Sequence, residues 1–155
     1  MGLSGLVWLR AQGGVLRWLD EWGWRRRKVP EHLAVGLRGE REALFHLRGL
    51  GYVVVARRWR TAKLRGDVDL IGWDGDRLCF VEVKTRTGRD GMDPAEAAVD
   101  EPKREMLRRM ARAYGKRFPA KLRGEVAVRF DVVSVYLQPT GVEFEVYRGA
   151  FGWQE

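Results

Sequence analysis

The sequence predicts one α/β domain in which helices flank a mixed β-sheet, in the order αβββαβ. Apolar residues recur at helical spacing in residues 31–50 and 103–118. Branched and aromatic residues dominate three strand-like stretches, at 52–59, 66–86 and 127–137. The chain has 155 residues, 45% of them hydrophobic, which is enough to bury a core of its own. We therefore expect the helices to cover the faces of a single sheet.

The whole chain is strongly basic. Its 29 Lys and Arg residues outnumber its 21 Asp and Glu residues, which gives a formal net charge of +8 and a pI near 10.1. This charge suits a polyanionic partner such as nucleic acid. The alternative is a basic surface with no such partner.

The cysteine and histidine content and the hydropathy of the chain argue against an internal disulfide, a zinc site and a membrane span. Cys79 is the only cysteine, so no disulfide can form within the chain, and its apolar strand indicates a buried small side chain. His32 and His46 lack i, i+4 spacing and cysteine partners, which disfavours a zinc site. No apolar run approaches the roughly 20 residues needed to cross a bilayer. We therefore expect a cytoplasmic protein without a membrane span.

Residues 1–30 form a Trp/Arg-rich N-terminal extension, which we expect to be helical. It holds four of the seven tryptophans: Trp8, Trp18, Trp22 and Trp24. Three roles stay open for it. It could dock on its own domain or a second subunit, act as a nucleic-acid arm, or lie on a membrane surface.

The helix expected at residues 31–50 carries one acid on its apolar stripe. The stripe consists of Leu33, Leu37, Leu44 and Leu47, and Glu40 falls between its members. A carboxylate directed at a core is costly unless it is paired or bound to metal. Glu40 therefore either lies at a rim, where it reaches solvent or an arginine, or reaches acids elsewhere in the fold.

The strand expected at residues 52–59 runs into a basic stretch. Its cations are Arg57, Arg58, Arg60, Lys63 and Arg65. They could hold a phosphate backbone while Trp59 stacks on a base. The alternative is a solvated sheet edge.

Residues 66–86 predict a β-hairpin with Asp74-Gly75 at its turn. Because strand side chains alternate between faces, one face is wholly apolar: Val68, Leu70, Cys79, Val81 and Val83. The opposite face carries Asp67, Asp69, Phe80, Glu82 and Lys84. Acids and a base therefore share a surface deep inside an apolar segment.

The register of this hairpin brings the acids together. A turn of two or four residues around Asp74-Gly75 places Asp67 opposite Glu82 and Asp69 opposite Phe80. Clustered carboxylates repel, which disfavours ionising all of them. A divalent cation removes that penalty, and hard oxygen ligands suit Mg²⁺ or Mn²⁺.

The rest of the chain supplies a loop, a helix and two strands. Residues 87–102 read as a loop that rims the acids, and residues 103–118 as a helix with an apolar face of Met106, Leu107, Met110 and Tyr114. Strands are expected at 127–137, where Asp131 is a structural or edge residue, and at 142–147. The main domain is then 31–148, with residues 149–155 as a tail.

The spacing Asp-x12-Glu-x-Lys, from Asp69 to Lys84, resembles the catalytic motif of the PD-(D/E)xK nuclease superfamily. Gly66 to Ile71 and Phe80 to Arg86 look closest to the bacterial YraN-like family of uncharacterised proteins. Its Gly-Glu-x-x-Ala element also matches Gly39, Glu40 and Ala43, and a lysine matches at Lys103. The resemblance extends more loosely to archaeal Holliday-junction resolvases, and it covers roughly residues 33–137. Val68 stands where the superfamily has its proline.

This resemblance implies a restriction-endonuclease-like core and a metal-dependent endonuclease that hydrolyses phosphodiester bonds, with DNA as the expected substrate. Asp69, Glu82 and the Val83 carbonyl would bind Mg²⁺ or Mn²⁺, and Glu40 would complete the shell. Lys84 would orient the attacking water or stabilise phosphorane charge. The supporting residues would be Asp67, which could exchange roles with Asp69, and Thr85 and Arg86. The residues expected to contact nucleic acid are Arg57, Arg58, Arg60, Lys63, Arg65 and Lys103.

Three further expectations accompany this assignment. Resemblance to resolvases implies a homodimer. The alternative function is a nucleic-acid-binding protein with a nuclease-like fold and no turnover. In a third interpretation the acids and Lys84 form a buried ion-pair network that serves the fold alone.

Overall fold

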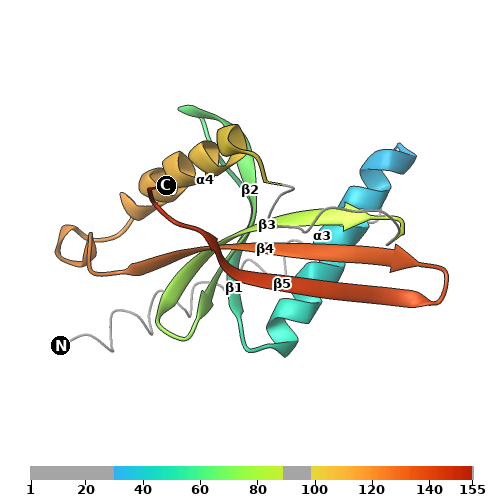
Figure 1. The fold of residues 1–155 in the computed structure, drawn as a ribbon. Helices are drawn as coiled ribbons and strands as arrows, with labels where there is room; N and C mark the ends of the chain where they lie inside the picture. The colour runs from blue at the N-terminus through green and yellow to red at the C-terminus, as the bar shows by residue number, and fades with distance from the viewer. Residues whose placement is uncertain (1–29, 89–98, 155) are drawn as a thin grey trace.

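The computed structural model describes residues 30–88 and 99–154, which form one five-stranded sheet with two α-helices (Figure 1). The elements follow the expected order: α3 (Glu31–Gly49), β1 (Val53–Thr61), β2 (Leu64–Asp74), β3 (Arg77–Arg86), α4 (Glu101–Gly115), a 3₁₀ turn (Ala120–Leu122), β4 (Ala127–Gln138) and β5 (Gly141–Phe151). The expected N-terminal extension and most of the expected 87–102 loop lie outside the described residues.

The sheet is mixed, as expected. Its strands lie in sequence order from β1 to β5. All neighbours are antiparallel except β3 and β4, which are parallel. A parallel pair needs a long crossover, and α4 lies between these two strands in the chain.

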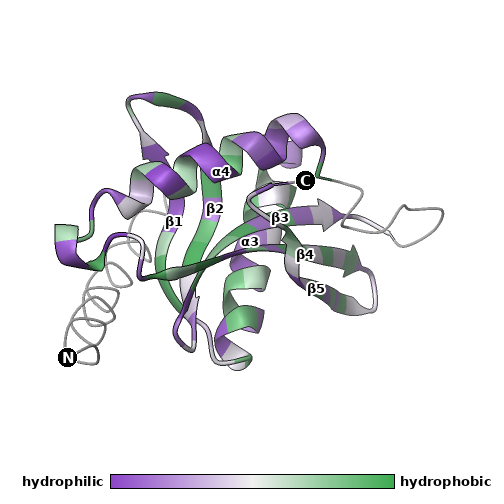
Figure 2. Ribbon diagram, turned by 60° about the vertical axis from the view of Figure 1, so that its left-hand side comes forward, coloured by the Kyte–Doolittle hydropathy of each residue, from purple (hydrophilic) through white to green (hydrophobic). Residues whose placement is uncertain are grey.

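The two helices cover opposite faces of the sheet. On the α3 side, Ala43, Leu44 and Leu47 pack with Leu70, Cys79, Val81 and Val83. On the α4 side, Leu107, Met110 and Ala111 pack with Ile71, Leu78, Phe80 and Phe130. Hydrophobic residues accordingly run along β2 and β3 in Figure 2, whereas α4 is hydrophilic on much of its surface. No helix within the described ranges is both long and apolar enough to span a bilayer.

The hairpin turn lies one residue later than the sequence predicted. Asp74 pairs with Arg77 and Leu70 pairs with Val81, so the two turn residues are Gly75 and Asp76. Gly75 has φ of 62°, a conformation that glycine adopts without strain. The predicted pairings of Asp67 with Glu82 and of Asp69 with Phe80 are therefore wrong, since Phe80 pairs with Ile71. The ladder begins at Leu70 and Val81, next to Asp69 and Glu82.

The alternation of β2 is interrupted at Asp69. Val68 packs in the α4-side core, whereas Leu70 packs in the α3-side core. The expectation that both share one face is therefore wrong. The adjacent strand β1 is irregular here as well, because Arg58 has φ of 44°, which is unusual for a residue other than glycine. The irregular backbone lies directly beside the candidate acids.

The helix and strand ends differ from expectation in three places. Leu33, expected on the apolar stripe of α3, is 46% exposed. Helix α4 ends at Gly115, yet Phe118 still joins the α4-side core. Strand β5 continues to Phe151, which is buried and stacks on Phe130 with ring centroids 4.9 Å apart. Residues 149–151 therefore belong to the sheet.

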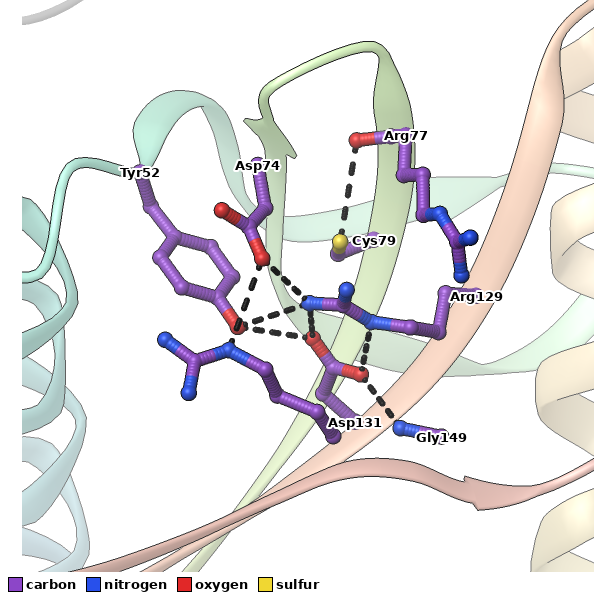
Figure 3. A network of polar contacts seen from close by, with 8 residues as sticks. Tyr52, Asp74, Arg77, Cys79, Arg129, Asp131 and Gly149 are labelled. Carbon is purple, nitrogen blue, oxygen red and sulfur yellow. Dashed lines mark hydrogen bonds and ion pairs between the residues drawn. The ribbon is translucent and has the colours of Figure 1, made fainter.

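Asp131 has a structural role, as the sequence suggested. It is fully buried and accepts hydrogen bonds from Tyr52 Oη (3.0 Å), Arg129 Nε (2.7 Å) and the Gly149 backbone N–H (2.9 Å). Arg129 also reaches Asp74 at 2.7 Å (Figure 3). The network ties β4 to β5, to the end of β2 and to the residue before β1.

Candidate functional site

Glu82 on β3 is the centre of the candidate site. Its carboxylate is almost completely buried and contacts two lysines. Lys84 Nζ lies 3.0 Å from Oε1, and Lys103 Nζ lies 2.9 Å from Oε2. Lys84 follows on the same strand, whereas Lys103 comes from α4. Because a buried carboxylate is costly without partners, these two ammonium groups stabilise the charge of Glu82.

The start of α4 directs Lys103 to this site. Asp100 caps the helix, since its Oδ1 accepts a hydrogen bond from the Lys103 backbone N–H at 3.0 Å. Burial lowers the pKa of Lys103, but the neighbouring carboxylates, chiefly Glu82, outweigh it and raise that pKa above its usual value. The sequence predicted Lys103 as one of the nucleic-acid contacts but did not settle its role. In the structure, Lys103 contacts Glu82 of the acid cluster.

Asp69 on β2 lies beside Glu82. Its Oδ2 accepts a hydrogen bond from the Val83 backbone N–H at 2.7 Å. Burial, and then the charge of Glu82, raise the pKa of Asp69 to about 8, although the Val83 N–H acts against this. In a strand, the N–H and C=O of one residue point to the same side. The Val83 carbonyl therefore also points toward β2 and Asp69.

Glu40 reaches the same group of acids from α3. Burial raises its pKa, and the charges of Asp67 and Glu82 add to this, while Arg58 lowers it. Arg58 Nε lies 3.8 Å from Glu40 Oε2, and within the described ranges this buried oxygen accepts no hydrogen bond. Glu40 thus combines both expected alternatives, an arginine neighbour and proximity to the acids.

Gly39 allows α3 to approach β3 closely. A Cβ built on Gly39 would lie 1.8 Å from Thr85 Oγ1 and 2.7 Å from Thr85 Cβ. No side chain larger than hydrogen fits there while Thr85 stays in place. This contact brings Glu40, the next residue of the helix, next to the strand that carries Glu82.

Two arginines of the basic stretch form ion pairs with the acids. Arg60 Nη2 lies 3.0 Å from Asp67 Oδ2, and Arg58 faces Glu40. Lys63 and Arg65 are exposed, and Arg57 is half-buried. The expectation of a free Trp59 ring is wrong, because that ring packs edge-on against Tyr114 with centroids 5.2 Å apart and adjoins the α4-side core. Thr85 and Arg86 are half-buried at the end of β3.

The donor chemistry suits a hard divalent cation, but the donors are not gathered around one point. Among residues 30–88 and 99–154, no three Asp, Glu, His or Cys side chains lie close enough together to bind one ion as they stand. The oxygens present are nevertheless the types that Mg²⁺ and Mn²⁺ prefer. They come from Asp69, Glu82, Glu40 and the Val83 carbonyl. The unsatisfied Glu40 oxygen and the proton-retaining Asp69 are both groups that a cation would stabilise.

Comparison with known proteins assigns this chain to a family. A model of the uncharacterised protein family UPF0102 matches residues 39–135, from Gly39 on α3 to β4. The chain belongs to family UPF0102. This confirms the YraN-like resemblance seen in the sequence.

UPF0102 relatives are similar to this chain over most of their length. A UPF0102 protein of Koribacter versatilis is 48% identical over 122 residues, which cover 79% of this chain and 82% of the relative. One from Solibacter usitatus is 49% identical over 127 residues (82% and 91%). One from Nocardia farcinica is 40% identical over 112 residues (72% and 84%). The family name assigns no activity.

Proposed function

We propose that this UPF0102 protein is a metal-dependent endonuclease with a restriction-endonuclease-like core. The observation that carries the proposal is the grouping of Asp69, Glu82 and Lys84 on two paired strands, with Glu40 brought to them by α3. Their spacing resembles the PD-(D/E)xK motif. Lys84 contacts Glu82, Asp69 accepts a hydrogen bond from the Val83 N–H, and the charge of Glu82 contributes to the raised pKa of Glu40. DNA is the expected substrate.

The roles of the acids follow from their positions. Asp69, Glu82 and the Val83 carbonyl would hold Mg²⁺ or Mn²⁺, with Glu40 completing the shell. Asp69 would give up its proton on binding the ion, and Glu82 would turn from at least one lysine. When bound, the metal supplies polarisation of a phosphoryl oxygen and a lowered pKa for its water.

The cations have separate roles around the acids. Lys84 carries three N–H donors and would orient the attacking water or stabilise negative charge on the phosphorane. Asp67 holds Arg60, so that this guanidinium stays beside the site. The exposed Lys63 and Arg65 would attract the phosphate backbone, in keeping with the net charge of +8. Thr85 supports the site through its contact with α3.

A panel of labelled DNA and RNA substrates tests the function. The panel includes single strands, duplexes and a four-way junction, each incubated with Mn²⁺ or with EDTA. We expect the wild type to cut at least one substrate only with Mn²⁺, and Lys84→Met to lose cutting while it still binds the substrate. Cutting that persists in EDTA, or equal cutting by Lys84→Met, would refute this assignment.

The alternative is a nucleic-acid-binding protein without turnover. One observation favours it: a lysine Nζ lies 3.0 Å from Oε1 of Glu82 and another lies 2.9 Å from Oε2, so the carboxylate is paired with positive charge without a metal ion. This alternative predicts that substrate binding is the same in Mn²⁺ and EDTA and that no substrate of the panel is cut. The homodimer stays a prediction, which light scattering at micromolar concentration can check.

A further inference from the structure

We propose that Lys103 competes with the divalent cation for Glu82, and that it passes to a phosphate of the nucleic acid when the metal binds. The inference rests on the proposed function and adds a coupling between two ligands. Metal ion and polyanion would each strengthen the binding of the other through a single lysine.

Lys103 lies against an oxygen of Glu82, which is one of the proposed metal ligands. Lys103 Nζ lies 2.9 Å from Glu82 Oε2, and Lys84 Nζ lies 3.0 Å from Oε1. A magnesium ion binds carboxylate oxygen at about 2.1 Å. An ion at that distance from Oε2 would stand within a few ångströms of the ammonium group, and the like charges would repel. One of the two must leave.

Lys103 is the lysine better placed to leave. Lys84 belongs to the same strand as Glu82, two residues away, so its backbone stays beside the carboxylate. Lys103 comes from another element, the first turn of α4. Its backbone is held by the Asp100 cap, while its flexible four-carbon stem lets the charged end move toward solvent.

The displaced charge would lie beside the reacting phosphate. A phosphate group that approaches the acids would pair with the ammonium group that lies against Glu82 in the metal-free protein. Removing Lys103 from Glu82 frees that carboxylate for the metal. By thermodynamic linkage, a polyanion that favours metal binding must itself bind more tightly when metal is present.

This coupling separates Lys103 from a merely structural lysine. If Lys103 only supported the fold, its loss would leave metal affinity unchanged or reduce it through disorder. Competition predicts the opposite sign, a gain of metal affinity on removal of the ammonium group. It also predicts that an arginine at this position preserves the competition.

Titration calorimetry of the full chain with Mn²⁺, without nucleic acid, measures the Mn²⁺ affinity of the wild type and of each variant. We expect Lys103→Met to bind Mn²⁺ about tenfold more tightly than the wild type, in the range of ordinary coupling between two sites. Lys103→Arg should keep the wild-type affinity. Lys121→Met removes the same charge at an exposed position and is the matched control, with no expected change. Thermal melts confirm that each variant is folded.

A second measurement follows the polyanion. In a Lys84→Met background, which prevents cutting, a four-way junction should raise Mn²⁺ affinity several-fold. The further change Lys103→Met should abolish that increase.

The outcomes distinguish this inference from the function on which it rests. Mn²⁺ binding by the wild type with unchanged or weaker binding by Lys103→Met would overturn the competition and leave the metal centre in place. Failure of every variant to bind Mn²⁺ would overturn both. Tighter binding by Lys103→Met, together with no cutting of any substrate, would support the competition and remove only the nuclease.

Discussion

The protonation of Asp69 affects the stability of the metal-free protein. Its pKa in the fold is about 8, against an ordinary value of 3.8, because burial and then Glu82 disfavour the carboxylate. Below pH 3.8 the Asp69 carboxyl is protonated in both the folded and the unfolded chain, so it does not change stability with pH. Between about pH 4 and 8 only the unfolded chain releases the proton, so stability falls as pH rises.

Asp69→Asn should therefore stabilise the metal-free protein. The amide oxygen can still accept the hydrogen bond from the Val83 N–H, while the ionisation penalty is gone. We expect a gain on the order of a few kcal/mol at pH 8, shrinking toward zero near pH 4. Melting curves in EDTA at several pH values measure it. A variant that is less stable than the wild type at every pH would show that Asp69 has no such penalty.

The same substitution should remove Mn²⁺ binding, since it deletes one of the proposed ligands. A stabilising change that abolishes ligand binding is typical of a functional position, where charge is held at a cost to the fold. The opposite pattern, a loss of stability with retained Mn²⁺ binding, would favour a structural network.

At the scale of elements, the contact of α3 with β3 determines where Glu40 lies. Gly39→Ala should destabilise the protein by about 1–3 kcal/mol, because its Cβ would overlap Thr85 and force the helix outward. Denaturant unfolding measures this. Gly36→Ala is the matched control on the same helix, since nothing lies within 4 Å of its Cβ.

We expect Gly36→Ala to raise the free energy of unfolding by about 0.5–1 kcal/mol, because alanine has the higher helix propensity. Equal effects of the two substitutions would contradict the close approach of the elements. We also expect Gly39→Ala to weaken Mn²⁺ binding in the protein that remains folded, because Glu40 moves with the helix.

The alternation of the β2–β3 hairpin was readable from the sequence because strand periodicity is local. It indicated that Glu82 and Lys84 share a face, and the helical spacing placed Glu40 on the buried side of α3. The turn was misplaced by one residue because Asp74-Gly75 and Gly75-Asp76 are both acceptable turns. The shift of the pairing by an even number of residues kept Leu70, Cys79, Val81 and Val83 on one face, whereas Val68 lies on the other.

Contacts between distant elements were not readable in this way. The meeting of Lys103 with Glu82 depends on how α4 crosses the sheet, and the interruption at Asp69 lies beside an irregular stretch of β1. The packing of Trp59 against Tyr114 likewise joins a strand to a helix more than 50 residues away. None of these follows from local spacing.

At the scale of the whole molecule, the sheet holds a second buried polar network besides the candidate site. Tyr52 and Arg129 donate hydrogen bonds to Asp131 in it (Figure 3), whereas Glu82 contacts Lys84 and Lys103. Asp131 is fully buried and accepts from a hydroxyl, a guanidinium and a backbone amide. Its loss would leave these donors without their acceptor.

Asp131→Ala should accordingly destabilise the protein by about 3 kcal/mol, as expected when one partner of a buried charged pair is removed. Glu125→Ala, at an exposed acid, should change stability by less than about 0.5 kcal/mol. Chemical denaturation of both variants measures the difference. Mn²⁺ affinity below the melting temperature should be unchanged in both. A loss of Mn²⁺ binding in folded Asp131→Ala would show that the two networks are coupled.

Single-turnover cleavage tests most directly the proposal that the acid cluster performs metal-dependent hydrolysis. The comparison is between the wild type, Glu82→Gln and Glu125→Gln, on the substrate that the panel identifies, with Mn²⁺ and with EDTA. We predict equal rates for the wild type and Glu125→Gln, a loss of at least about 100-fold for Glu82→Gln, and no cutting in EDTA. Cutting by Glu82→Gln at the wild-type rate would contradict the proposal.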